Sequence, residues 1–482
     1  MRVIRMPAIA ARRRARRTAI LAIGLGAIPI AAFATPASAS AAATTKPVVT
    51  SVLNNNMHVA SGAVGGGGTV TIRGTHFTGV RKVVFGSTPG TNVHVLSAGK
   101  LTVRSPAHAA ARVDVRVMTA AGTSGITTHD RFYFQVRNHL DGGNGHSCQT
   151  LGTGTARCFG ENNLGQLGNG TAIESHVPVQ VRGLSTAVSI ATGDFHSCAL
   201  LAGGAVKCWG RNGEGQLGNG TNTPSATPVT VLNLGTALAI SAGSDHSCAL
   251  VVGGTVRCWG SNGFGQLGNG TTTDSPLPVQ VHNLHNAVAV ASGLGHNCAT
   301  ISDGSERCWG LNGDGQLGNG TTIDRLVATP VSGVHRAIAA ALGDNTSCIL
   351  NTVAKVLCWG RGTDGELGNG TTKSSALPVA VSGLSNVTKL ALGGFHGCAM
   401  VASGGALCWG FGPEGQIGNG SFTDALTPTV VAGLHNVADI GCGEFHSLAL
   451  LNNGTTKTWG YNGFGQLGNG TTTTSPVPVT VS

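Results

Sequence analysis

The feature that most constrains this chain is a seven-residue motif that returns at intervals of fifty residues. GQLGNGT occupies residues 165–171 and is repeated without change at 215–221, 265–271, 315–321 and 465–471. Near-copies, GELGNGT and GQIGNGS, occupy 365–371 and 415–421. A fixed period of this length is typical of propellers and solenoids, in which each repeat buries its apolar faces against its neighbours. The sequence therefore predicts a repeat architecture for most of the chain.

Short apolar runs between the motifs predict strands, because Gly, Asn and Pro interrupt them before a helical period can develop. One copy contains four such runs: VPVQV (177–181), VSIATG (188–193), HSCALL (196–201) and AVKCWG (205–210). Four short strands in fifty residues are typical of a propeller blade. We predict an all-β protein in which residues 140–482 form a seven-bladed propeller. We also expect the last strand, VPVTV (477–481), to pair with the first hairpin and close the ring.

These repeats resemble the regulator of chromosome condensation repeat family. The resemblance is carried by HSCAL, by CWG-N-x-x-G-Q-L-G and by the Pro-Val element that follows in successive copies. It implies a seven-bladed propeller. The founding member of that family exchanges nucleotide on a small nuclear GTPase. We do not transfer that activity, because one fold serves many unrelated functions.

Residues 47–136 lack the repeat and predict a second domain. Their strand-like segments are TVTIRG (69–74), RKVVFG (81–86), VDVRVMT (113–119) and RFYFQV (131–136), with turn signals between them. This pattern favours a small β-sandwich. GGTVTIRGTHFTGV (67–80), VVFG (83–86), VDVRVMTAAGTS (113–124) and FYF (132–134) resemble the immunoglobulin-like IPT/TIG family. In that family the module binds partners or spaces other domains.

The N-terminus predicts export. RRRARR (12–17) precedes an apolar run at 18–34, and Ala37-Ser38-Ala39 offers a small-residue cleavage site, so we interpret residues 1–39 as a secretory signal peptide and 40–46 as a flexible leader. The alternatives of Sec and twin-arginine export stay open. We expect no membrane span in the mature chain and a location outside the cell or at its surface.

The net charge of +10 does not predict a nucleic-acid partner. Seven arginines and no acidic residue lie in 1–39, which leaves 23 basic against 20 acidic residues in the rest. An excess of this size, without a basic cluster, is too weak for binding to a phosphate backbone.

Cysteine spacing predicts six disulfides within blades. Twelve of the thirteen cysteines occur in pairs ten residues apart, each pair bracketing a hairpin turn. The seventh copy has Leu448 and Thr458 in their places, and losing both together is what a bonded pair predicts. Cys442 is left as a buried free thiol. The predicted bonds join Cys148 with Cys158, Cys198 with Cys208, Cys248 with Cys258, Cys298 with Cys308, Cys348 with Cys358 and Cys398 with Cys408.

Residues that recur at one phase of the repeat are interpreted as structural. All six tryptophans lie in a WG pair, which predicts a role in the core between blades. Six histidines also share one phase, and a metal-binding ring is the alternative to a hydrogen-bonded structural role. We favour the structural role and predict no metal and no cofactor. The histidines are His146, His196, His246, His296, His396 and His446.

Two further patterns resemble functional motifs only in their letters. Asp245-His246-Ser247 places neighbouring residues on opposite faces of a strand, so it cannot form a catalytic relay. The Asn-Gly-Thr sequons, such as that at Asn169, are explained by turn chemistry.

Two positions in each repeat vary in sequence, while the rest of the repeat is nearly constant. These variable positions predict the binding face. One lies before the histidine and the other after WG, at the open end of the hairpin. Aromatic residues gather there late in the array, and we predict that they bind the partner: Phe395, Phe411, Phe445, Tyr461 and Phe464.

The sequence as a whole predicts a secreted, monomeric, non-catalytic binding protein. Its partner would be an unidentified extracellular or cell-surface protein. One alternative is a secreted inhibitor, because the chain is similar in architecture to a known secreted propeller that blocks β-lactamases. The other alternative is an enzyme, such as a lyase or a glycosidase, that uses the channel.

Overall fold

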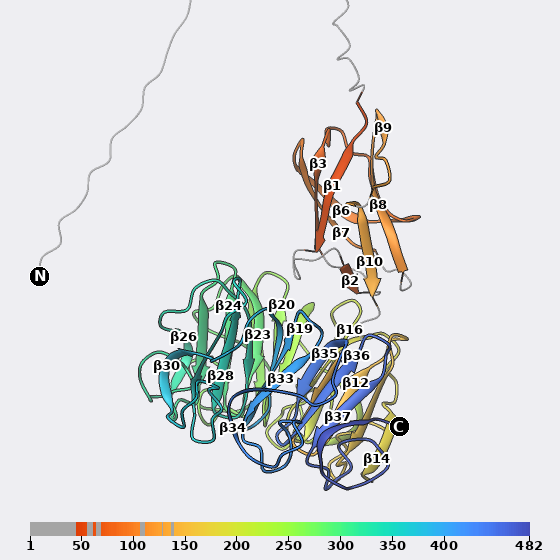
Figure 1. Ribbon diagram of the computed structural model, residues 1–482. Helices are drawn as coiled ribbons and strands as arrows, with labels where there is room; N and C mark the ends of the chain where they lie inside the picture. Colours follow the sequence, from red (N-terminus) through yellow and green to blue (C-terminus); the bar gives the residue numbers. More distant parts are fainter. Residues whose placement is uncertain (1–44, 55–60, 64–68, 107–110, 128, 136–138) are drawn as a thin grey trace, which may run out of the picture. The chain divides into compact units, whose positions relative to one another are not determined.

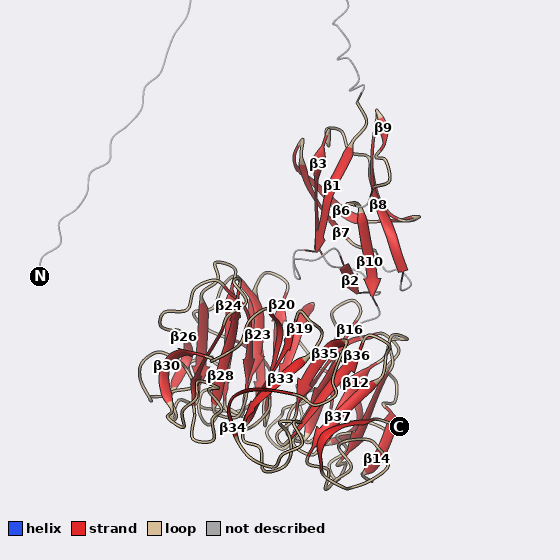
Figure 2. Cartoon of the chain, in the orientation of Figure 1, coloured by secondary structure: helices blue, strands red, loops and turns tan. Residues whose placement is uncertain are grey.

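The computed structural model describes residues 45–54, 61–63, 69–106, 111–127, 129–135 and 139–482. None of the described residues is helical (Figure 2). Accordingly, none of them belongs to a helix that could cross a membrane. The expected signal peptide (1–39) lies outside the described residues, as does most of the leader.

The N-terminal part contains two sheets, with mostly antiparallel pairing, that share one core. Residues Val70 and Ile72 of one sheet and Val115, Val117 and Phe132 of the other are fully buried in it. The first sheet has the order β1 (Val48–Asn54), β3 (Thr69–Thr75), β7 (Lys100–Arg104) and β6 (Thr91–Ser97). The second has the order β2 (Ser61–Ala63), β10 (Arg131–Gln135), β8 (Ala111–Thr119), β4 (Lys82–Phe85) and β5 (Thr88–Pro89), with β9 (Gly122–Thr123) paired to β8.

Residues 140–482 form seven four-stranded antiparallel sheets, and neighbours in sequence are neighbours in each sheet (Figure 1). The first sheet contains β11 (Leu140–Gly142), β12 (His146–Thr150), β13 (Ala156–Gly160) and β14 (Ser175–Gln180). The second contains β15 (Ala187–Thr192), β16 (His196–Leu201), β17 (Val206–Gly210) and β18 (Ser225–Thr230). The third contains β19 (Ala237–Ala242), β20 (His246–Val251), β21 (Thr255–Gly260) and β22 (Ser275–Gln280).

The remaining four sheets repeat the same order. They are β23 (Ala287–Ser292), β24 (His296–Ile301), β25 (Glu306–Gly310) and β26 (Arg325–Pro330); β27 (Ala337–Leu342), β28 (Thr346–Asn351), β29 (Val356–Gly360) and β30 (Ser375–Ala380); β31 (Val387–Leu392), β32 (His396–Val401), β33 (Ala406–Gly410) and β34 (Ala425–Val430); and β35 (Val437–Cys442), β36 (His446–Leu451), β37 (Thr456–Gly460) and β38 (Ser475–Thr480).

The GQLGNGT motif is the joint between one sheet and the next. The Gln166 carbonyl accepts hydrogen bonds from Trp209 Nε1 at 2.8 Å and from Ser197 Oγ at 3.1 Å, both in the following sheet. Gly168 has a φ of 65°, and an added Cβ would lie 2.7 Å from Trp209 Nε1. Only glycine fits this close approach. The repeated motif is therefore a structural joint.

The expectation that the last strand pairs with the first hairpin is wrong. β38 pairs with β37 in its own sheet, and the first sheet supplies its own fourth strand, β14. The physical reason lies in the loop at 161–174, which turns the chain back onto the hairpin that precedes it. Asn162 holds that loop, since its Nδ2 donates to the carbonyls of Thr171 and Ile173 at 3.1 and 2.9 Å. Each VPV strand thus completes the preceding sheet.

The last and first sheets meet through the same joint as the others. Ser147 Oγ donates to the Gln466 carbonyl at 2.9 Å and lies 2.7 Å from His446 Nε2. Gly470 N donates to the His176 carbonyl at 2.9 Å. The two ends of the array are therefore joined by side chains and a loop, without exchange of a strand.

Six disulfides join the two central strands of the first six sheets, and they are the pairs expected from the spacing. In each pair the two cysteines are cross-strand partners, with Cα atoms 4.0 to 4.1 Å apart. In the seventh sheet Leu448 faces Thr458 at the same place. Cys442 is buried and unpaired, as expected. The bonds join Cys148 with Cys158, Cys198 with Cys208, Cys248 with Cys258, Cys298 with Cys308, Cys348 with Cys358 and Cys398 with Cys408.

We predict that reduction of the denatured mature chain adds twelve hydrogen atoms to its mass, two for each of the six disulfides. Intact-mass measurement before and after reduction checks this. As a control, alkylation without reduction should label Cys442 alone. Several labels on the unreduced chain would contradict the pairing.

Candidate functional site

The two variable places of each repeat lie side by side at one end of its hairpin. In the sixth sheet the Phe411 amide donates to the Phe395 carbonyl at 3.0 Å, and in the seventh the Tyr461 amide donates to the Phe445 carbonyl at 2.9 Å. Antiparallel pairing of the histidine strand with the WG strand forces this contact, because the histidine of one strand faces the glycine of the other. Successive sheets present both places at the same end.

Three of the five predicted aromatic residues form one cluster. The Phe395 and Phe445 rings stack with centroids 5.5 Å apart, and Phe411 meets both edge-on at 6.2 Å. Tyr461 and Phe464 form a separate edge-on pair at 6.1 Å. All five side chains are partly exposed. We call Phe395, Phe411 and Phe445 the aromatic cluster.

Arg361 borders the aromatic cluster and was missed by sequence reasoning. Its guanidinium lies 5.2 Å from the centroid of the Phe395 ring and pairs with Asp364 at 2.8 Å and with Glu366 at 3.0 Å. Glu366 is almost fully buried, and it stands where the other six copies of the motif have Gln. The change from GQLGNGT to GELGNGT was the signal, because a buried carboxylate needs a cationic partner.

Three carboxylates occupy the same position in their repeats, two residues before the position of the recurring histidine. They are Asp194, Asp344 and Glu444, and they line a central cavity of about 250 Å³ bounded by the inner strands of all seven sheets. Sequence reasoning noted these positions as variable but found no set of paired carboxylates. Their shared repeat phase was the available signal.

Burial raises the pKa of each of these carboxyl groups. The pKa of Asp194 is raised to about 6, that of Asp344 to about 7 and that of Glu444 to about 8. Repulsion between them adds to the effect of burial, since Asp194 and Asp344 both raise the pKa of Glu444. Asp194 is relieved by a hydrogen-bond donor, Ser244 Oγ at 2.5 Å. Near neutral pH the group therefore holds protons that a nearby cation would displace.

The histidines hold neighbouring sheets together. His146 Nε2 lies 2.9 Å from Ser197 Oγ, and the other five make the same contact with a Ser or Asn of the next sheet at 2.7 to 2.9 Å. Because Ser197 gives its proton to the Gln166 carbonyl, the imidazole must donate. Burial lowers the pKa of His146 to about 3, so the ring is neutral. This geometry agrees with the structural role.

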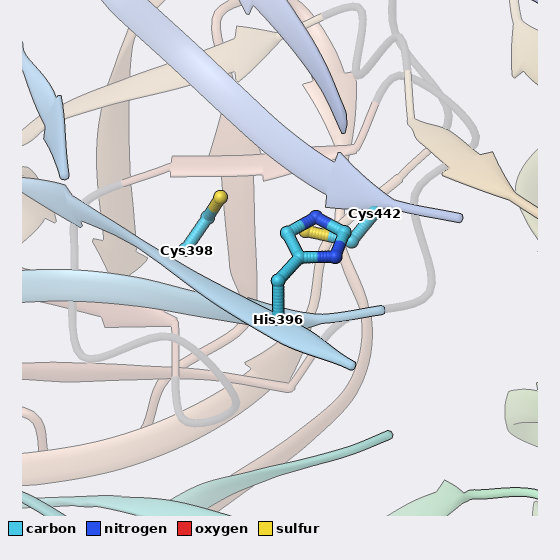
Figure 3. A group of neighbouring side chains, drawn as sticks. All are labelled: His396, Cys398 and Cys442. Carbon is cyan, nitrogen blue, oxygen red and sulfur yellow. The ribbon is translucent and has the colours of Figure 1, made fainter. Parts of the chain in front are cut away.

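His396, Cys398 and Cys442 are the one group of potential metal ligands whose donor atoms converge within 4.8 Å among the described residues (Figure 3). Cys398 is bonded to Cys408 and is not free to ligate. His396 Nε2 is engaged with Ser447 Oγ at 2.7 Å, and burial raises the pKa of the Cys442 thiol to about 12. The group therefore lacks the ionised, unoccupied donors that a metal site needs.

The Asp245-His246-Ser247 sequence forms no relay. Asp245 pairs with Arg211 at 3.0 Å, and His246 Nε2 contacts Asn297 at 2.9 Å. Asn169 likewise has a local role, because its Oδ1 accepts from Thr171 N and Oγ1 at 3.1 and 2.8 Å. These contacts agree with the structural interpretation of both motifs.

The core of the joint is also structural. All six tryptophans are fully buried, and each indole N–H donates to the carbonyl of the second residue in the preceding motif. Phe159 fills the place in the first sheet and is 1% exposed. These rings therefore form part of the core between neighbouring sheets and are not available to bind a ligand.

Comparison with known families identifies the repeated part. The family model described as RCC1-like domain matches residues 128–437, which is more than half of the chain. The chain belongs to the RCC1-like domain family. Two matches to the regulator of chromosome condensation (RCC1) repeat, at 437–466 and 453–482, extend this RCC1-like domain to the last residue. The IPT/TIG domain model matches residues 47–134.

Solved structures support the fold of the RCC1-like domain. Yeast RCC1 (Prp20), in a crystal structure bound to Kap60, is 21% identical, with a TM-score of 0.62 over 68% of this chain and 83% of that one. Human WBSCR16 is 24% identical, with a TM-score of 0.61 over 67% of this chain and 94% of that one. Identities this low support the propeller fold alone. Among curated proteins, none matches the chain.

Proposed function

We propose that this chain is a secreted, non-catalytic protein that binds another protein with one face of a seven-bladed propeller. The seven sheets are its blades, and residues 47–136 form an immunoglobulin-like sandwich that precedes it. The binding face is the end of the hairpins that carries the aromatic cluster. The partner is a protein outside the cell or at its surface, and the chain acts as a monomer.

The observation that carries this proposal is the aromatic cluster itself. Phe395, Phe411 and Phe445 come from two adjacent sheets and remain partly exposed. The structural aromatics of the same sheets, Trp409 and Trp459, are completely buried. Partly exposed aromatic side chains that gather on one face are the usual anchors of a protein interface.

Export is supported by the disulfides. Six disulfides in one chain are typical of an oxidising compartment. The signal-like residues 1–39 agree with this interpretation. Binding of proteins is also consistent with the similar structure of yeast RCC1, which was crystallised with Kap60.

The proposal is tested by crosslinking the tagged mature chain on living cells and identifying the captured proteins. We expect a partner that the Phe395→Ala/Phe445→Ala variant binds at least ~30-fold more weakly, a loss of about 2 kcal/mol, because hot-spot aromatics contribute at this level. The Tyr461→Ala/Phe464→Ala variant measures how much the separate pair of Tyr461 and Phe464 contributes to the affinity for the partner. Affinities are measured with the purified partner.

Phe264→Ala is the matched control. Phe264 occupies the same place after WG in the third sheet as Phe464 in the seventh, and it is 43% exposed, but it lies outside the aromatic cluster. We expect this variant to bind as the unmodified chain does. Full affinity in both double variants, with unchanged melting temperatures, would move the site to another surface.

A further inference from the structure

The carboxylates of the central cavity adjoin the aromatic cluster. A Cβ added to Gly394 would lie 2.7 Å from Glu444 Cγ and 3.2 Å from Asp344 Oδ1, so both acidic side chains reach over this glycine. Gly394 directly precedes Phe395, and Glu444 directly precedes Phe445. The acidic opening of the cavity, formed by Asp194, Asp344 and Glu444, is thus continuous with the surface proposed to bind the partner.

No cationic side chain among the described residues forms an ion pair with the three carboxyl groups of this opening. Glu444 Oε2 is buried and accepts no hydrogen bond there. The arginines nearby are already paired elsewhere, Arg361 with Asp364 and Glu366, and Arg211 with Glu214 and Asp245. Deeper in the cavity, Lys389 pairs with Asp439. A buried carboxylate without a partner favours the approach of an external cation.

The geometry favours an extended organic cation over a metal ion. A metal requires several donor atoms around one point. The one convergent group of potential ligands among the described residues is that of His396, and it includes none of the three carboxylates. An ammonium or guanidinium group instead binds separated carboxylates through several N–H donors. The adjoining phenylalanine rings suit its apolar stem and its apolar neighbours.

We infer that the partner places a lysine or arginine side chain, flanked by apolar residues, over the cavity opening between Asp344 and Glu444, with the flanking residues on the aromatic cluster. This inference rests on the proposed function, because it names the chemistry of the partner at the same face. The aromatic cluster holds the apolar flanks, and the carboxylates select the cation.

The test uses peptides in place of the unidentified partner. A phage library of random dodecapeptides is panned against the mature chain, and the best binder is synthesised with its basic residue intact or replaced by citrulline or norleucine, its neutral counterparts. We expect enriched peptides to carry Lys or Arg beside apolar residues. The neutral analogue should bind at least ~10-fold more weakly, about 1.4 kcal/mol, because it leaves the carboxylates unpaired.

The Asp344→Asn/Glu444→Gln variant is the decisive comparison, since it removes the charge and keeps the shape. In this variant the charged and neutral peptides should bind equally, with an unchanged melting temperature. A preference for the charged peptide that persists there would overturn the inference. So would the failure to enrich any peptide, or enrichment of peptides without basic residues.

Two further outcomes separate this inference from the proposed function. Peptides that lose binding in the Phe395→Ala/Phe445→Ala variant but bind equally well with citrulline or norleucine would overturn the inference alone. Calcium chloride that raises the melting temperature of the unmodified chain, but not of the Asp344→Asn/Glu444→Gln variant, would make the opening a metal site and also overturn it.

Discussion

Replacement of Trp309 by alanine is expected to lower the free energy of unfolding by about 3–5 kcal/mol, the range for a fully buried aromatic residue. Trp309 has no exposed surface and packs against the core of the preceding sheet, which includes Cys258 and Leu267. Its indole N–H also donates to the Gln266 carbonyl at 3.0 Å. The variant opens a cavity at the joint and removes one of two donors to that carbonyl. Urea denaturation of the mature chain measures the change.

Trp309→Phe is the matched control, because the chain itself uses phenylalanine at this place in Phe159. The smaller ring keeps much of the packing and loses the N–H donor, so we expect a cost below that of alanine, about 1–2 kcal/mol. Equal unfolding midpoints for Trp309→Ala and the unmodified chain would contradict the role of the indole as the core of the joint.

Much of the fold could be predicted because each repeat places the same residues in the same surroundings. The strands, the cysteine pairs and the buried tryptophans all followed from their constant phase. The assignment of VPV strands to sheets did not follow. A long loop, 161–174 in the first copy, separates the WG strand from the VPV strand, and local sequence does not say whether that strand pairs with the hairpin before it or after it. In five of the seven copies an Asn equivalent to Asn162 holds this loop against the preceding hairpin. Gly362 and Gly412 take its place in the fifth and sixth copies, where the strand pairs in the same way, so the pairing depends on the loop as a whole.

The candidate site was only partly predictable for a different reason. The aromatic residues were recognisable from their types, although the sequence did not separate the pair of Tyr461 and Phe464 from the aromatic cluster. Asp344 and Glu444 belong to different sheets with another sheet between them, and their proximity depends on the missing side chain at Gly394. A contact across an intervening sheet is a property of the assembled ring. Repeat phase indicates only that both carboxylates point to the same end.

Replacement of Thr300 and Glu306 by leucine and valine is expected to stabilise the protein, because these two polar residues occupy apolar places. They face each other across β24 and β25. Glu306 is 1% exposed, and burial raises its pKa to about 8. Keeping this carboxyl group protonated at pH 7 costs about 3 kcal/mol relative to the unfolded chain. The equivalent pairs are wholly apolar in four of the other six sheets: Leu200 with Val206, Leu250 with Val256, Leu350 with Val356 and Met400 with Ala406.

The pH dependence of this stabilisation distinguishes removal of the buried Glu306 carboxyl group from a simple gain in packing. Below 4.5, the ordinary pKa of a glutamate side chain, both the folded and the unfolded chain hold the Glu306 proton, so its ionisation costs nothing. As the pH rises from 4.5 towards 8, the unfolded chain releases the proton while the folded chain retains it, and stability falls. The stabilisation given by Thr300→Leu/Glu306→Val should therefore grow over this range and level off above it. A stabilisation that stays constant with pH would show that Glu306 does not titrate as its burial requires.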